Sequence, residues 1–315
     1  MMNSFFRSTP DKRPRIPYFS AMLTLEHLAA LLEKYRDAAS ARVESFSIGD
    51  KRFDFNSQSA IMGVINLSPD SWYRESVCLT AESAIQRGRV LKEQGADIVD
   101  IGAESTLAQA ARADGPEQNS KLLPVIRELR AANILVSVET YQTSVTRACL
   151  EAGANILNLT GNDAEESFRM VAAHDAAVIL CYVQGKNVRE VGEFDFSADP
   201  IAMMREHFAR QIELAARLGV KKVFVDPGLG FYYRNLRDSA ARVRHQMNIF
   251  LNSFRLRELG FPVCNALPHA FEYFREEVRS AEPFFATLAG FGKTDLFRTH
   301  EVPRVKAVLD TMKVF

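Results

Sequence analysis

From residue 60 to the end of the chain, short apolar runs alternate with longer segments in which apolar residues recur at helical spacing. The short runs are rich in β-branched residues and apolar on both faces, which is typical of parallel strands covered by helices. Segments such as 80–95 and 199–219 predict the intervening helices. The eight predicted strands are AIMGVIN (60–66), DIVDIGAE (97–104), ILVSVE (134–139), NILNLT (155–160), AVILCYV (177–183), KVFVDP (222–227), PVCNAL (262–267) and DLFRTH (295–300).

Eight strands, each followed by a helix, predict an α/β fold in which a parallel sheet closes into a (β/α)8 TIM barrel. Gly95, Gly153 and Gly219 follow helical segments, where a left-handed residue commonly ends a helix. A doubly wound open sheet would normally carry a GxGxxG sequence after its first strand, and this chain has none there. We therefore expect the barrel to occupy residues 60–315.

Residues 1–59 form an N-terminal extension with a different pattern. A basic, proline-containing start precedes an amphipathic helix predicted over 24–42. Residues 45–56 alternate like a hairpin that turns at Gly49 and Asp50. We expect the hairpin to close the mouth of the barrel where the strands begin. The helix could cover the same end or contact a second subunit.

The composition is that of a globular domain with a substantial core, with 47% hydrophobic and 25% charged residues. The 39 basic residues balance the 39 acidic ones, so no overall field attracts nucleic acid or an anionic membrane. Four widely spaced cysteines without a CxxC pair disfavour a zinc site or a disulfide framework and favour a reducing compartment. The chain start lacks the apolar core of a signal peptide, and no apolar run reaches about 18 residues, so we expect a cytoplasmic protein.

Polar side chains end almost every predicted strand, and in (β/α)8 barrels the functional residues lie at these C-terminal strand ends. Taken singly, each residue would be explained as a cap for the following loop or helix. Together they would face one crevice, and unpartnered buried polar groups cost about 1–3 kcal/mol each, so the pattern predicts a site that hydrogen-bonds a ligand. The residues are Asn66, Glu104, Ser105, Thr106, Glu139, Thr140, Asn158, Gln184, Asp226, Asn265, His269, Arg298 and His300.

The residue types at three of these positions suggest the chemistry of the ligand. The carboxylate of Asp226 could accept two parallel N–H bonds, while the amide of Asn158 supplies a donor and an acceptor. Arg298 could stack on a ring or bind an anion. A flat heterocycle with an amidine-like edge, such as a guanine-like or pterin-like ring, fits these groups, which do not distinguish between the two.

Six motifs occur in an order and spacing that resemble dihydropteroate synthase, from about residue 60 to the C-terminus. The resemblance implies a (β/α)8 barrel, usually dimeric. It also implies an enzyme that condenses 6-hydroxymethyl-7,8-dihydropterin pyrophosphate with p-aminobenzoate and releases pyrophosphate in the presence of Mg2+. The motifs are IMGVINLSPDSW, DIVDIGAEST, SVETY, GANILNLTG, VFVDPGLGF and LFRTHEV.

The same resemblance assigns roles to individual positions. Asn66 corresponds to the residue near Mg2+ and pyrophosphate, and one amide oxygen suits an ion that prefers oxygen ligands and keeps several waters. Asn66, Arg298 and His300 are the expected catalytic residues, with Asn66 as the metal ligand. The expected pterin-binding residues are Thr106, Glu139, Asn158, Asp226, His269 and Arg298.

Several segments depart from the family pattern, which makes this chain an atypical member. Glu139 replaces an aspartate, and the loop from Trp72 to Ser76 replaces Phe-Ser-Asp-Gly-Gly. Residues 107–109 replace Arg-Pro-Gly. Leu267-Pro268-His269 stands where the family has Ser-Arg-Lys, and a histidine replaces a lysine charge only when protonated. Trp72 could form a lid over the ligand or anchor its own loop.

Three functions are compatible with these residues. The first is a transferase that condenses the pterin diphosphate with p-aminobenzoate or a related amine. The rewritten loops motivate the second, a pterin-binding paralogue without synthase activity. The third, a methyl-folate-dependent methyltransferase, is disfavoured because NLSPDS and FRTHEV resemble the diphosphate-handling enzymes.

Overall fold

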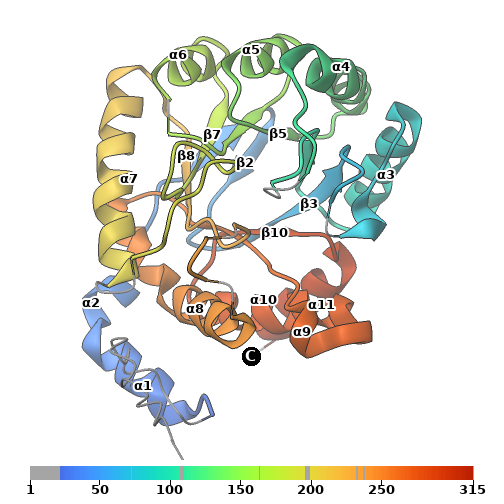
Figure 1. The fold of residues 1–315 in the computed structure, drawn as a ribbon. Helices are drawn as coiled ribbons and strands as arrows, with labels where there is room; N and C mark the ends of the chain where they lie inside the picture. Colours follow the sequence, from blue (N-terminus) through green and yellow to red (C-terminus); the bar gives the residue numbers. More distant parts are fainter. Residues whose placement is uncertain are drawn as a thin grey trace, which may run out of the picture.

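The computed structural model of the chain describes residues 22–71, 73–106, 110–162, 164–195, 199–231, 233–236 and 238–314. Eight parallel strands form a barrel surrounded by helices (Figure 1). Each predicted run contains one strand: β3 (Ala60–Asn66), β4 (Ile98–Gly102), β5 (Val136–Thr140), β6 (Ile156–Leu159), β7 (Ala177–Cys181), β8 (Val223–Asp226), β9 (Cys264–Ala266) and β10 (Leu296–Thr299).

The strand order shows that the barrel closes. The sheet runs β8-β7-β6-β5-β4-β3-β10-β9, with all neighbours parallel. Its two outer strands are joined by a parallel bridge between Val225 and Val263, and the Val225 amide donates to the Pro262 carbonyl at 3.0 Å. The predicted (β/α)8 barrel is therefore confirmed.

The helices predicted over 80–95 and 199–219 are present on the outside of the barrel. Asp114, Asp199 and Asp238 each cap a helix by accepting a backbone N–H in its first turn. Gly95 and Gly219 follow α3 and α7 with φ of +103° and +89°, which residues with a Cβ rarely adopt. The outer helices are α3 (Ala81–Glu93), α4 (Gly115–Ala131), α5 (Thr143–Glu151), α6 (Glu165–Ala173), α7 (Pro200–Arg217), α8 (Ser239–Asn252), α9 (Phe271–Phe274), α10 (Ala281–Phe291) and α11 (Val302–Lys313). No described helix is long and apolar enough to cross a membrane.

The predicted single helix over 24–42 is wrong, because the segment is broken at Tyr35. Two helices, α1 (Leu25–Lys34) and α2 (Arg36–Ala39), lie beside the barrel (Figure 1). Tyr35 leaves the helical region with φ −128° and ψ 39°. Its ring lies under the guanidinium of Arg255, 3.9 Å from the ring centroid, and Arg255 also pairs with Asp199. The residue at which the helix is interrupted therefore contacts a residue far away along the chain.

The Tyr35→Leu substitution is expected to lower the free energy of unfolding by about 1 kcal/mol, because it removes this cation–π contact while keeping an apolar side chain. Urea denaturation measures the change. Tyr273→Leu serves as the control, since Tyr273 is 54% exposed and its loss should leave stability unchanged. Equal stability of both variants and the wild type would contradict a stabilising role for Tyr35.

The predicted hairpin is present and lies where the barrel strands begin. Strands β1 (Phe46–Ile48) and β2 (Lys51–Phe53) are antiparallel and turn at Gly49. Phe46 and Phe55 meet Phe224 of β8 edge-on, with ring centroids 5.3 and 5.4 Å apart. Lys51 forms an ion pair with one carboxylate oxygen of Asp97. The other oxygen accepts the backbone N–H of Ile61 in β3, the first strand of the barrel. The division of the chain at residue 59 stays a prediction.

Candidate functional site

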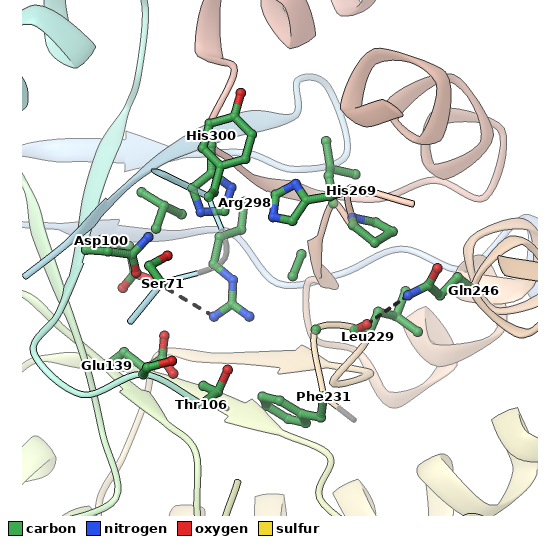
Figure 2. Close-up of a pocket in the computed structure, with 18 of the residues that line it drawn as sticks. Ser71, Asp100, Thr106, Glu139, Leu229, Phe231, Gln246, His269, Arg298 and His300 are labelled. Atoms are coloured by element: carbon green, nitrogen blue, oxygen red, sulfur yellow. Dashed lines mark hydrogen bonds and ion pairs between the residues drawn. The ribbon is translucent and has the colours of Figure 1, made fainter. Parts of the chain in front are cut away.

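A cavity of about 150 Å³ opens at the C-terminal ends of the barrel strands. Eight of the thirteen polar strand-end residues line it: Asn66, Glu104, Ser105, Thr106, Glu139, His269, Arg298 and His300. Figure 2 shows Arg298 at its centre, with Glu139 and Thr106 on one side and the two histidines on the other. The predictions for Trp72 and for residues 107–109 lie outside the described residues.

Arg298 on β10 connects two acidic residues beneath the cavity. Its Nη2 lies 3.4 Å from Oδ2 of Asp226, and its Nη1 lies 3.9 Å from Oδ2 of Asp100. The second oxygen of Asp226 accepts the Gly228 amide at 2.8 Å. Asp226 is fully buried and does not line the cavity itself.

Asn158 lies in the same group but does not line the cavity. Its amide nitrogen donates to Oδ2 of Asp100 at 3.1 Å, and its carbonyl oxygen accepts from the Cys181 thiol at 3.3 Å. Asp100 was not among the site residues predicted from the sequence. Its position indicated a functional role, because it is an acidic residue in the middle of an otherwise apolar strand.

The floor of the cavity holds more carboxyl groups than cations. Burial raises the pKa of Glu139 to about 7, with Arg298 opposing the shift and Asp100 and Asp226 adding to it. Burial also raises the pKa of Asp226, although Arg298 and the Gly228 amide oppose the shift. Three carboxyl groups thus surround one guanidinium, which leaves a surplus of hydrogen-bond acceptors.

The opposite wall of the cavity holds two histidines on one buried acid, Glu282 of α10. Nδ1 of His300 lies 2.8 Å from Oε1 of Glu282, and Nδ1 of His269 lies 3.5 Å from the same oxygen. The ring of Tyr73 stacks on both imidazoles. Glu282 was not predicted from the sequence, because an acidic residue in the first turn of a helix is common without any functional role.

The charges on this wall follow from the same contacts. Burial alone would raise the pKa of Glu282, but hydrogen bonds and charge from His300 lower it below its usual value. The pKa of His269 is lowered to about 4 because the ring is buried and lies beside His300. A neutral His269 therefore does not replace the lysine charge that the resemblance implies at this position.

Two further contacts shape the rim. The amide nitrogen of Asn66 donates to Ser76 at 2.6 Å, which leaves its carbonyl oxygen as the ligand atom of this side chain. This arrangement fits the single oxygen ligand expected for Mg2+. Arg189, buried in the loop after β7, donates to the Ser105 carbonyl at 2.6 Å and so fixes the backbone next to Thr106.

Five of the thirteen polar strand-end residues do not line the cavity: Thr140, Asn158, Gln184, Asp226 and Asn265. Asn265 is buried and donates to Ser253 at 3.0 Å and to Thr294 at 2.7 Å. Gln184 donates to the Tyr182 hydroxyl at 2.8 Å. Both residues therefore have structural contacts instead.

Known proteins share this sequence and architecture. The model of the pterin binding enzyme family matches residues 62–263. The chain is 30% identical over 221 residues to a dihydropteroate synthase of Synechocystis sp., covering 69% of this chain and 73% of that protein. The crystal structure of Xanthomonas albilineans dihydropteroate synthase with 4-aminobenzoic acid superposes with a TM-score of 0.72 at 25% identity, covering 86% of this chain and 97% of that chain. This protein belongs to the pterin binding enzyme family, the family that includes the dihydropteroate synthases.

Proposed function

We propose that the protein is a transferase of the dihydropteroate synthase type, acting in folate biosynthesis. It would condense 6-hydroxymethyl-7,8-dihydropterin pyrophosphate with p-aminobenzoate or a related amine and release pyrophosphate. The observation that carries this proposal is the surplus of carboxyl groups around Arg298. A guanidinium and the amidine-like edge of a pterin present similar N–H donors, so the floor that now binds Arg298 is complementary to that edge.

The chain's own residues would bind and orient the two substrates. Asp226 would hold the pterin edge once Arg298 leaves it, and Asn158 keeps Asp100 in place. The released guanidinium, with its planar face, could then stack on the ring or bind the diphosphate. His300 lines the same cavity and could donate a hydrogen bond to that anion.

The reaction breaks the C–O bond between the pterin methylene and the diphosphate and forms a C–N bond to the aniline nitrogen, which then loses its proton to solvent. Stabilisation of the departing anion and orientation of the amine would supply most of the rate enhancement, so no strong general base is needed. Mg2+, when bound at the Asn66 oxygen, would neutralise charge on the diphosphate.

Pyrophosphate release from the pterin diphosphate, measured with and without p-aminobenzoate, tests this proposal. We expect release that depends on the amine and on Mg2+. Binding of the pterin without release, whichever aromatic amine is added, would instead indicate the paralogue without synthase activity. Failure to bind any pterin would overturn both proposals.

We also propose a cytoplasmic homodimer. The four cysteines are all buried free thiols, which suits a reducing compartment. Phe284 and Phe291 of α10 are 42% and 55% exposed, and large exposed aromatic side chains are typical of subunit contacts.

A further inference from the structure

We propose that His269, Glu282 and His300 form a binding site for a divalent transition-metal ion, such as Zn2+, on the cavity wall opposite the acidic floor. One ligand atom from each residue lies within 4.8 Å of the other two. This site is separate from the Mg2+ position proposed at Asn66, and it requires no pterin.

The ligand types select the kind of metal. Two imidazoles and one carboxylate suit Zn2+, Co2+ or Fe2+, and they commonly leave coordination positions open in catalytic sites. Mg2+ prefers oxygen ligands in a nearly octahedral arrangement and would bind this set poorly. The cysteine spacing in the sequence disfavoured a zinc site, and Glu282 is the residue that reveals a ligand set without cysteine.

The positions of the three residues already approach those of a metal site. Nδ1 of His300 and Nδ1 of His269 lie 2.8 and 3.5 Å from Oε1 of Glu282. Ligands about 2.0–2.2 Å from a tetrahedral Zn2+ lie roughly 3.3–3.6 Å from one another. The two printed distances to Glu282 are thus close to those that such an ion requires.

One unsatisfied group points to a missing cation. Glu282 itself is fully buried and well supplied with hydrogen bonds, since its oxygens accept from Nδ1 and the backbone N–H of His300, from the Thr299 hydroxyl and from the Glu301 amide. Nδ1 of His269 is also buried, and within the described part of the chain it has no hydrogen-bond partner. Buried ring nitrogens are normally paired, and a divalent cation beside Glu282 would give this nitrogen a partner.

The surrounding residues hold the ligands in place. The second oxygen of Glu282 accepts from the Thr299 hydroxyl and from the Glu301 amide at 3.0 Å. The Tyr73 ring stacks on His300 and His269, with centroids 4.6 and 4.9 Å apart, and its hydroxyl donates to Glu301. Such outer contacts raise metal affinity by fixing ligand orientation.

The open side of the site faces the cavity. His269 and His300 both line it and lie on the same side of Arg298 in Figure 2. A bound ion would therefore have room for water or for an anionic oxygen of a ligand inside the cavity.

Titration with Co2+ tests the site on tag-free, chelator-treated full-length protein, without any pterin. We expect one Co2+ per chain, seen by visible absorption, displaced by Zn2+ and not by excess Mg2+. His269→Asn and His300→Asn should each weaken Co2+ binding by at least about tenfold. His174→Asn is the matched control, because His174 is an exposed histidine at the end of α6 and should not affect binding.

Glu282→Gln should have the same effect, and circular dichroism checks that this buried variant folds. If Glu282→Gln does not fold, Co2+ binding by His269→Asn tests the site instead. The proposal is wrong if no Co2+ binds, if Mg2+ displaces it, or if all variants bind it equally. None of these outcomes affects pyrophosphate release from the pterin diphosphate, so this inference and the proposed function can fail separately.

Discussion

Asp226→Asn is expected to weaken pterin binding by about tenfold to a hundredfold, because a hydrogen bond to a charged group contributes about 1.5–3 kcal/mol. The substitution keeps the shape of the side chain and an oxygen for the Gly228 amide, but it removes the anionic acceptor under the cavity. Calorimetric titration with 6-hydroxymethyl-7,8-dihydropterin measures the loss of affinity.

The same variant should keep its stability near neutral pH. Arg298 keeps Asp100 as an ion-pair partner in this variant, so the buried guanidinium is not left without a carboxylate. Asp295→Asn is the matched control. Asp295 is also buried, its pKa is raised to about 7, and it pairs with Arg257 at 3.4 Å near the strand beginnings. Its substitution should leave pterin affinity unchanged, and equal losses of affinity in both variants would exclude a direct role for Asp226.

Glu139→Gln is expected to change how stability depends on pH. The pKa of Glu139 is about 7 in the folded protein and close to 4.5 in the unfolded chain, so the folded state binds more protons between these values. This group therefore favours folding below pH 4.5, and that contribution is lost as the pH rises through 7. The total change is up to about 3 kcal/mol.

Glutamine cannot ionise, so the variant lacks this loss. Urea denaturation should show similar stabilities for the variant and the wild type at pH 5 and a more stable variant at pH 8. Glu213→Gln, at an exposed position of α7, should show no such difference between the two pH values. Parallel pH profiles for Glu139→Gln and the wild type would show that Glu139 is ionised at neutral pH in the folded protein.

The barrel could be predicted because its strands are buried on both faces. Runs such as 177–183 are continuously apolar, and this signal does not depend on distant residues. The break of the N-terminal helix at Tyr35 was not predicted, and Tyr35 contacts Arg255, far away along the chain. Periodicity reports which face of a segment is apolar, and it contains no information about a contact of that kind.

The sequence by itself determined the barrel, the rim where its polar strand ends gather, and the family. Parallel strands in a closed barrel all end at the same rim, and this follows from the backbone alone, without knowledge of side-chain contacts. The tertiary structure alone decided that Arg298 covers Asp226 and Asp100, and that Glu282 lies between two histidines. Burial removes water as a hydrogen-bond partner, so each of these polar groups must be paired with another group of the protein. The partners come from separate helices and strands, and only the folded structure shows which side chains meet.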